Sequence, residues 1–284
     1  MLVMEALQWA NDKLKGIADS SMLDGELLLA AALGVTKSWL FTHLDHEMKA
    51  HEEERFQEFV KRRSEHEPVA YIVGWKEFYK RRFTVNRFTL IPRPATETLV
   101  EKAIQSLNDL TTQSLHDSIF ADIGTGSGAI AITLAAETRL PVIAVDMSTQ
   151  ALSVAAANAA QHGVEELVDF KHGNLIEPVI RIFKAVGVTH EAPYHHLVLC
   201  ANLPYLSEHQ METAQLDVRD FEPHEALVSG RDGLDDYFAL FKLLKRHRAS
   251  LPERVTVLIE IDPSQCQSAP NLIAHDFPHA RPEI

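Results

Sequence analysis

Cysteine and basic residues are scarce in this 284-residue chain, and each scarcity excludes a class of protein. Two cysteines, Cys200 and Cys266, are too few for a disulfide framework or a zinc finger. Lys and Arg number 27 against 40 Asp and Glu, which gives a formal net charge of −13. Such an acidic chain is a poor candidate for a free-standing nucleic-acid-binding protein, because neutralising phosphates requires an excess of cations.

Long hydrophobic runs and targeting signals are also missing from the sequence. No apolar run reaches the roughly 18 residues that a membrane-spanning helix needs. The first residues include Glu5 but no Lys or Arg before Lys13, unlike a secretory signal or a transit peptide. These absences predict a reduced, cytoplasmic protein without membrane contact. The histidines have no clustered cysteines beside them, so no metal site is expected.

Composition divides the chain into three regions, which predict two domains and a linker. Residues 1–75 have apolar side chains at helical spacing and a net charge of −5, typical of a small all-α domain. Residues 76–94 carry a net charge of +5 and short apolar segments among turn residues, which indicates a β-hairpin. This basic linker is either a solvated face or a contact for a phosphate-bearing or acidic partner.

Residues 95–284 alternate between strand-like and helix-like segments. Strands are expected at 118–123, 141–145, 167–172, 196–201 and 255–261, and helices at 96–106, 129–137, 149–162 and 237–248. Alternation of this kind predicts an α/β domain with a parallel sheet that carries helices on both faces.

A glycine-rich turn follows the first of these strands. The sequence Ile119-Phe-Ala-Asp-Ile-Gly-Thr-Gly-Ser-Gly places Gly124, Gly126 and Gly128 just after Asp122. Glycines allow a sharp turn and let a ligand approach the main-chain N–H groups. The spacing is G-x-G-x-G, whereas a nicotinamide-dependent dehydrogenase, the alternative interpretation, has the longer G-x-G-x-x-G.

Polar side chains end the next two strands. Asp146 comes 22 residues after Gly124 and can accept both hydrogen bonds of a ribose diol. Asn174 follows the next strand, where an adenine ring would be recognised. Together with the glycine turn, these residues resemble the S-adenosylmethionine site of class I methyltransferases. The resemblance implies S-adenosyl-L-methionine as the cofactor and S-adenosyl-L-homocysteine as its product.

The tetrad Asn202-Leu-Pro-Tyr205 directly follows an apolar strand. It resembles the (Asn/Asp/Ser)-Pro-Pro-(Tyr/Phe) motif of methyltransferases that act on planar nitrogens of amides or amino-purines. A carboxamide nitrogen is a weak nucleophile, because its lone pair is delocalised into the carbonyl group. The Asn202 side-chain oxygen and the Leu203 carbonyl can each accept one hydrogen of the NH2 group, which orients the nitrogen toward the methyl donor. Pro204 stiffens the turn, and Tyr205 can pack on the planar group.

Three further segments resemble a single family. Residues 83–101, 222–237 and 258–265 are similar to the domain linker, the post-catalytic segment and a late strand of the peptide chain release factor glutamine N5-methyltransferases (the HemK/PrmC-like family). The likeness covers about residues 70–265. It implies a Rossmann-like class I methyltransferase domain of the seven-stranded type, preceded by a small helical domain and a β-hairpin linker. The last strands of that sheet are expected to be missing, because the chain ends at Ile284.

The resemblance also implies the reaction and the residues that perform it. The expected reaction is methylation of N5 of the glutamine in the Gly-Gly-Gln motif of class 1 peptide chain release factors, with no stable nucleic-acid partner. The residues that would bind the methyl donor are Gly124, Thr125, Gly126, Ser127, Gly128, Asp146, Asn174, Leu175 and Asn202. Those that would hold the glutamine are Asn202, Leu203, Pro204 and Tyr205. Arg93, Pro94 and Glu97 are expected to shape the pocket wall, and the helical domain to recognise the release factor.

Several positions depart from the pattern of the family. Leu203 stands where proline is usual, Ala95 where an acidic residue is common, and Leu175 where an aromatic residue is frequent. The carbonyl at position 203 is unaffected, but the turn loses rigidity and the adenine packs less well. Without the last two strands, the strand at 255–261 is expected to form an uncovered apolar edge.

Two other functions remain open. An adenine N6-methyltransferase acting on RNA or DNA would use the same tetrad and donor site, but it gives no reason for the charge of −13 or for the helical domain. A catalytically silent binding protein would bind the methyl donor without turnover. Cys200 is expected to be a small buried strand residue, and Glu260 is left without a role.

Overall fold

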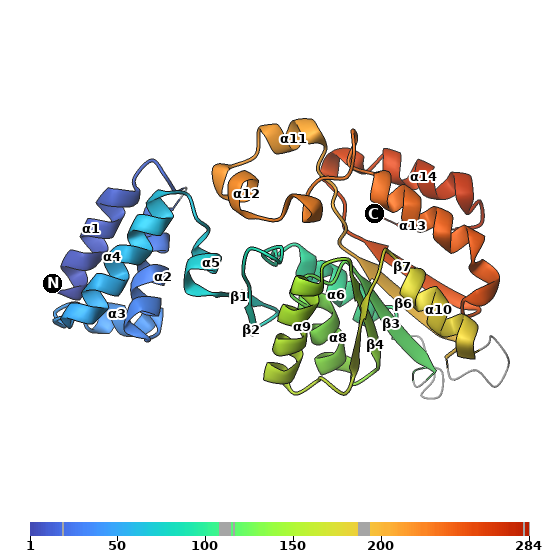
Figure 1. Cartoon of the computed structure of the whole chain (residues 1–284), viewed down its shortest axis with the longest axis horizontal. Coiled ribbons are helices and arrows are strands. Elements are labelled where there is room, and N and C mark those ends of the chain that lie inside the picture. Colours follow the sequence, from blue (N-terminus) through green and yellow to red (C-terminus); the bar gives the residue numbers. More distant parts are fainter. Residues whose placement is uncertain (19, 108–114, 116, 187–193, 281, 284) are drawn as a thin grey trace. The chain divides into compact units, whose positions relative to one another are not determined.

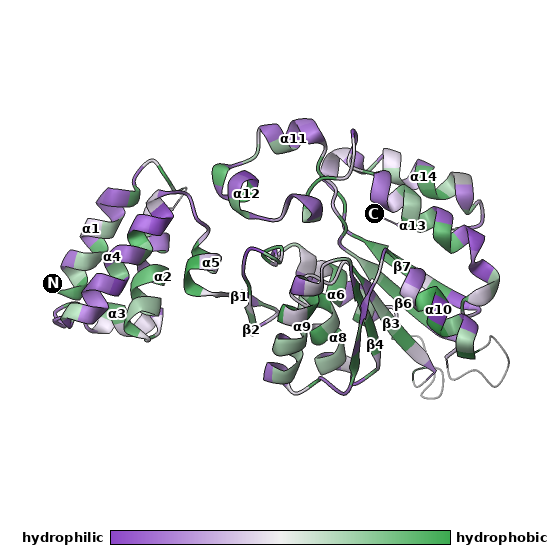
Figure 2. Ribbon diagram, viewed as in Figure 1, coloured by the Kyte–Doolittle hydropathy of each residue, from purple (hydrophilic) through white to green (hydrophobic). Residues whose placement is uncertain are grey.

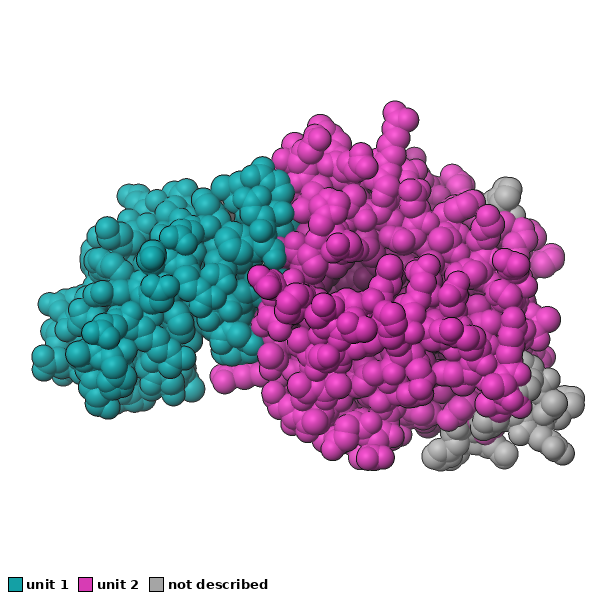
Figure 3. All heavy atoms as spheres, viewed as in Figure 1, with its two compact units in different colours: residues 1–75, 215–221 teal, residues 76–214, 222–284 magenta. Residues whose placement is uncertain are grey.

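The computed structural model describes the chain except for residues 19, 108–114, 116, 187–193, 281 and 284 (Figure 1). The chain forms two compact units, shown in different colours in Figure 3. Unit 1 comprises Met1–Trp75 and the segment Gln215–Phe221, and unit 2 comprises Lys76–Ala214 and Glu222–Ile284. A short segment that follows the tetrad in sequence is therefore part of the helical unit.

Unit 1 is helical, and its helices bury the apolar stripes of the sequence. Its helices are α1 (Val3–Leu14), α2 (Ser21–Leu33), α3 (Lys37–Thr42), α4 (Ala50–Ser64), α5 (Val69–Val73) and α12 (Leu216–Phe221). The core contains Ala6, Leu28 and Phe56, all fully buried. The strongly charged α4 keeps Phe56, Phe59 and Val60 on its buried face. Figure 2 shows this helix as a mixture of hydrophilic and hydrophobic residues.

The β-hairpin is shorter than the linker sequence predicts. Its strands are β1 (Trp75–Phe78) and β2 (Arg81–Thr84), joined through Tyr79 and Lys80, which both have positive φ. Two such residues make the tight turn that matches the twist of paired strands. Residues 85–94 contain no strand, because the chain turns again at Asn86, whose carbonyl accepts a hydrogen bond from the Thr89 N–H at 2.9 Å.

Unit 2 contains a parallel sheet of five strands within its described residues. The strands are β3 (Ser118–Ile123), β4 (Val142–Asp146), β5 (Val168–His172), β6 (His196–Ala201) and β7 (Arg254–Ile259). Their order is β5-β4-β3-β6-β7, and every neighbouring pair is parallel. The predicted α/β class is confirmed. In the described residues β7 has a strand partner on one side only, and its residues are mostly half-buried.

Helices cover both faces of this sheet (Figure 1). On one face lie α6 (Thr96–Gln105), α8 (Ala129–Thr138) and α9 (Thr149–His162), which share a core with Phe120, Ala144 and Val198. On the other face lie α10 (Glu177–Val186), α13 (Asp235–Arg246) and α14 (Ser268–Asp276), packed on Ala121, Val145 and Leu199. Alternate residues of each strand thus face opposite helix layers. Figure 2 shows the mainly hydrophobic strands between them.

The remaining elements are short. They are α11 (Glu208–Glu212), η1 (His224–Ala226), η2 (Arg248–Ser250) and η3 (Pro263–Gln265). None of the helices in the described part of the chain is both long and apolar enough to cross a membrane.

Candidate active site

The strand register brings the sequence motifs to one edge of the sheet. Ile123 pairs with Val145 on one side and with Ala201 on the other, and Ala201 pairs in turn with Ile259. These four residues form one row at the carboxyl ends of the strands. The next residues along the chain are Gly124, Asp146, Asn202 and Glu260. The glycine turn, the acidic residue, the tetrad and Glu260 therefore share the edge where α/β sheets bind ligands.

Two of the glycines in the turn have a steric reason to be there. Gly124 has φ +74°, and a Cβ atom at this position would lie 3.2 Å from Cδ2 of Leu203 in the tetrad. Gly128 has φ +81°, and a Cβ there would lie 2.7 Å from Cδ1 of Ile132 and 3.1 Å from Cβ of Ala155. Residues that carry a Cβ atom rarely adopt these positive φ angles. The turn thus approaches the tetrad at one end and packs between α8 and α9 at the other.

Asp122 and Asn158 support the turn from within the protein. Asp122 is fully buried, and its Oδ2 accepts hydrogen bonds from the Thr125 hydroxyl at 2.6 Å and the Ala131 N–H at 3.1 Å. Burial raises the pKa of Asp122 to about 7. Asn158 on α9 donates from Nδ2 to the Ser127 carbonyl at 2.8 Å. The sequence did not single out Asn158, although an amide in an alanine-rich helix was a signal that it has a buried partner.

Asp146 joins the turn to the following helix. Its Oδ2 accepts a hydrogen bond from the Gly126 N–H at 2.8 Å, and its Oδ1 accepts one from the Ser148 N–H at 2.8 Å. Burial raises the pKa of Asp146, while these backbone groups lower it. A carboxylate has about four acceptor positions. Asp146 can therefore hold the backbone turn and still accept hydrogen bonds from the hydroxyls of a ribose.

Asn174 and Leu175 follow β5, which is separated by β4 and β3 from β6, the strand that precedes the tetrad. Asn174 is exposed, and its carbonyl accepts a hydrogen bond from the Glu177 N–H at 3.1 Å. Leu175 is buried and has φ +46°, in the left-handed region that non-glycine residues rarely occupy. Local strain of this kind is typical of ligand-binding segments.

Asn202, the first residue of the tetrad, has a buried side-chain oxygen that accepts no hydrogen bond from the described residues. Its Nδ2 donates to Oγ1 of Thr96, the first residue of α6, at 3.2 Å. Its Oδ1 is buried and has no hydrogen-bond partner within the described residues. Buried acceptors are normally paired, so an unpaired one at a strand end marks a place for a ligand that donates hydrogen bonds.

The rest of the tetrad is held by residues that follow it in the chain. Tyr237 on α13 is fully buried, and its hydroxyl accepts a hydrogen bond from the Leu203 N–H at 3.1 Å. The same hydroxyl contacts the carbonyl groups of Ala201 and Glu260. The Tyr205 carbonyl accepts a hydrogen bond from Nε2 of Gln265 at 3.0 Å. The sequence did not assign these supporting roles, because they depend on contacts between distant segments.

The residues expected to form the pocket wall have separate partners. Arg93 pairs with Glu222, whose Oε2 also accepts a hydrogen bond from the Ile91 N–H at 3.1 Å. This contact joins two of the segments that resemble the family. Glu97 accepts a hydrogen bond from the Tyr79 N–H at 2.8 Å and thus engages the hairpin turn. Pro94 is exposed.

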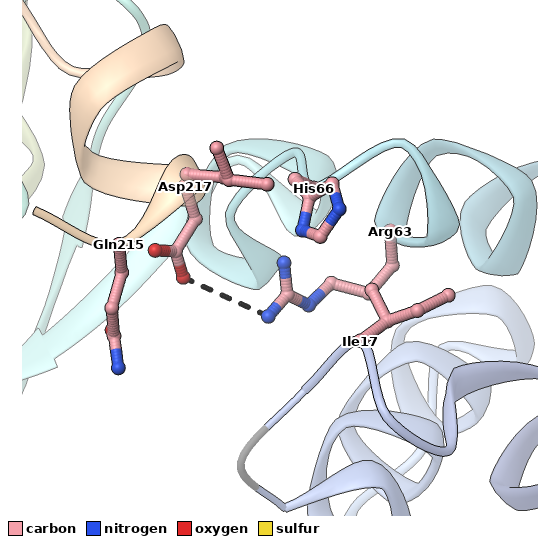
Figure 4. A pocket seen from close by; sticks show the side chains of 6 residues that line it. Ile17, Arg63, His66, Gln215 and Asp217 are labelled. Carbon is pink, nitrogen blue, oxygen red and sulfur yellow. Dashed lines mark ion pairs between the residues drawn. The ribbon is translucent and has the colours of Figure 1, made fainter. Parts of the chain in front are cut away.

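A separate hollow lies within unit 1 (Figure 4). Its volume is about 170 Å³, and it is lined by Ile17, Arg63, His66, Gln215, Leu216 and Asp217. Arg63 is buried and pairs with Asp24 at 2.7 Å and with Asp217 at 3.7 Å. It also donates to the Glu67 carbonyl at 3.3 Å. The described residues contain no cluster of side chains suited to a metal ion, here or elsewhere.

Comparisons with known proteins agree with this architecture. Residues 5–74 match the family model of the PrmC N-terminal domain, and residues 116–181 match that of a methyltransferase domain. The release factor glutamine methyltransferase of Bacillus cereus is 35% identical over 286 residues, which cover 100% of this chain and 94% of that protein. That of Bacillus subtilis is 36% identical over 99% of this chain and 92% of that protein. That of Xylella fastidiosa is 40% identical over 75% of this chain and 71% of that protein.

Two of the solved structures that resemble this chain have lower sequence identity to it. The ribosomal protein L11 methylase of Lactobacillus delbrueckii covers 66% of this chain and 70% of its own, with 18% identity and a TM-score of 0.40. The match to the catalytic domain of hMettl16, in complex with an RNA hairpin, covers 71% of this chain and 68% of that chain. The identity is 13% and the TM-score is 0.47.

Proposed function

Because this chain belongs to the release factor glutamine methyltransferase family, we propose that it methylates the glutamine of the Gly-Gly-Gln motif in class 1 peptide chain release factors. The methyl group moves from the sulfonium of S-adenosyl-L-methionine to the side-chain amide nitrogen N5, and S-adenosyl-L-homocysteine is released. The amide proton leaves N5 after the transfer, so no strong base is needed while the new bond forms.

The unpaired Oδ1 of Asn202 carries this proposal. It is a buried acceptor at the carboxyl end of β6, beside the glycine turn. An amide NH2 group that donates one hydrogen to Oδ1 and the other to the Leu203 carbonyl is held with its nitrogen lone pair directed out of the amide plane. Orientation of this kind offsets the weak nucleophilicity of the nitrogen. Tyr205, half-buried beside it, can pack on the planar group of the substrate.

The residues around the glycine turn fit the methyl donor. Gly124, Thr125, Gly126, Ser127 and Gly128 form a turn without bulky side chains at the strand edge, and Asp146 keeps acceptor capacity for a ribose. Asn174 and Leu175 follow the adjacent strand, at the position proposed for the adenine ring. When bound there, the donor supplies an electrophilic methyl group. The protein then has only to hold it in line with the amide nitrogen.

The helical residues 1–75 and the linker 76–94 are proposed to recognise the release factor, and residues 95–284 to catalyse the transfer. Not every cation of the linker is free for this role, because Arg81 pairs with Glu137 and Arg93 with Glu222. Lys80 and Arg87 are exposed. We place the reaction in the cytoplasm, without a membrane or a stably bound nucleic acid. The two cysteines are free, as expected in a reducing compartment.

A transfer assay tests the proposal directly. The protein is incubated with methyl-labelled donor and either a wild-type release factor or one whose Gly-Gly-Gln glutamine is replaced by alanine. We expect label on the wild-type factor only, and mass spectrometry should locate it on N5 of that glutamine. Equal labelling of both factors, or labelling of RNA or DNA alone, would show that the substrate is a different group.

A further inference from the structure

Glu260 is a half-buried acid beside the tetrad, and the proposed reaction gives it no task. It follows β7 directly, and its N–H donates to the Ala201 carbonyl at 3.1 Å. The Tyr237 hydroxyl contacts the carbonyl groups of both residues. The backbone of Glu260 is thereby fixed next to the residue that precedes Asn202. Its Oε2 is buried and, like Oδ1 of Asn202, has no partner among the residues described.

The side chains of Thr96, Asn202 and Glu260 form one polar group. Asn202 Nδ2 donates to the Thr96 hydroxyl oxygen at 3.2 Å. Side-chain hydrogen bonds from Thr96 and Asn202, together with the positive charge of Arg93, lower the pKa of Glu260, although burial raises it by more. The other titratable groups that face Glu260 are Tyr205 and Tyr237, which are neutral near pH 7. Arg93 is therefore the positively charged group that acts on Glu260 in this part of unit 2. Arg93 is also paired with Glu222.

The two ends of the Asn202 amide are not equivalent beside such a group. An ionised carboxylate can only accept hydrogen bonds, so it attracts the NH2 end of an amide and repels the oxygen end. The Thr96 hydroxyl has a single hydrogen, and when that hydrogen is given to Glu260 its oxygen can only accept from Asn202. Both neighbours then select the same orientation, in which Nδ2 faces Thr96 and Glu260. Oδ1 is left for a donor from outside the group.

We propose that Glu260 and Thr96 are positioning residues that lock the Asn202 amide with its oxygen toward the substrate glutamine. This inference rests on the proposed function, since it takes Asn202 to be the residue that holds the substrate NH2. Glu260 must be ionised for this purpose. A protonated Glu260 can donate a hydrogen bond to Oδ1 and so favour the opposite orientation, which presents an NH2 group to the NH2 group of the substrate.

The kinetic test uses Glu260→Gln, Thr96→Val and Thr96→Ser, with Asp262→Asn as the control. Asp262 is a carboxylate two residues further on, and its Oδ1 accepts a hydrogen bond from the Ser264 N–H at 2.9 Å, so its removal takes away a charge without touching Asn202. We expect Glu260→Gln and Thr96→Val to lower kcat by about 10–100-fold. Donor affinity and Tm should stay near wild type, Thr96→Ser should restore kcat, and Asp262→Asn should not change it.

The pH profile separates positioning from a purely structural role. In the wild type, kcat should decrease at low pH as Glu260 becomes protonated. In Glu260→Gln, which has no carboxyl group at this position, kcat should not show this decrease. A Glu260→Gln enzyme with wild-type kcat and an unchanged acid limb would overturn the inference. So would a loss of Tm or donor affinity that accounts for the whole loss of rate.

A measurement without a release factor distinguishes failure of this inference from failure of the proposed function. In the ¹⁵N-labelled protein, the side-chain NH2 signals of Asn202 should show two protected hydrogens that become exchangeable in Glu260→Gln. Unprotected signals in the wild type would overturn the positioning role even if methyl transfer to glutamine is observed. If the signals are protected but the protein transfers no methyl group to glutamine, the proposed function is overturned. The fixed orientation of the Asn202 amide would then have no role in catalysis.

Discussion

Two regions of this molecule contain buried polar atoms, and they differ in one respect. In one region these atoms have hydrogen-bond or ion-pair partners within the protein, and in the other some of them have none. In the hollow of unit 1, Arg63 forms an ion pair with Asp217, as Figure 4 shows. It also pairs with Asp24 and donates to the Glu67 carbonyl. At the strand edge of unit 2, Oδ1 of Asn202 and Oε2 of Glu260 are buried with no partner in the described residues. Satisfied groups of this kind stabilise a fold, whereas leftover acceptors indicate where the donors of a ligand bind.

The largest effect on stability is expected in unit 1. Arg63→Ala leaves Asp24 without its partner at 2.7 Å and should destabilise unit 1 by about 3–5 kcal/mol. Arg62→Ala is the matched control, because Arg62 is less buried than Arg63 in its pair with Glu67, and its loss should cost about 1 kcal/mol. Urea unfolding followed by hydrogen exchange measures both. If Arg63→Ala instead weakened methyl-donor binding without loss of stability, the hollow would be a functional site.

A smaller and pH-dependent effect is expected at Asp122. Its pKa in the folded protein, about 7, exceeds the ordinary value of 3.8, so the folded state holds the proton more tightly. Wild-type stability should therefore fall as the pH rises from 4 to 7. Asp122→Asn cannot ionise and should be more stable than the wild type by about 2 kcal/mol or more at pH 8. This advantage should shrink as the pH approaches 4 in thermal unfolding of the donor-free protein. An advantage independent of pH would show that Asp122 is not protonated more readily when folded.

The smallest effect is expected for Leu203→Pro. Proline has no N–H, so the hydrogen bond to the Tyr237 hydroxyl is lost, at a cost of about 1 kcal/mol. The stiffer turn offsets part of this cost. Methyl-transfer activity should stay close to wild type, because the carbonyl at position 203 remains in place. Loss of most activity in this variant would show that the Leu203 N–H contact, and not the carbonyl alone, maintains the site.

The parts of the fold and site that follow from local sequence could be predicted. The strands at 118–123 and 196–201 and the helix at 149–162 lie where their apolar patterns indicate. The glycine turn and the tetrad lie at strand ends, because a parallel sheet brings the carboxyl ends of its strands to one edge. The helix α10 was not predicted, although Val179, Ile180 and Phe183 have helical spacing and are buried.

The parts that depend on pairing of distant segments could not be predicted. Thr96 and Asn202 are 106 residues apart, and only the packing of α6 against the sheet brings them together. Glu260 reaches Asn202 through the register of β6 and β7, which the sequence does not specify in detail. The assignment of Gln215–Phe221 to the helical unit had no local signal either. In the hairpin linker, composition indicated strands but did not show that they end at Thr84.

The oxygen of Asn202 is the group on which the proposed reaction depends most directly. The decisive measurement is single-turnover methyl transfer to a release factor by Asn202→Ala, with donor affinity determined by calorimetry on the same sample. We expect the rate to fall by about 100–1,000-fold while the Kd of the donor changes little. Methyl transfer at the wild-type rate by this variant would contradict the assignment of Asn202 as the acceptor that holds the glutamine.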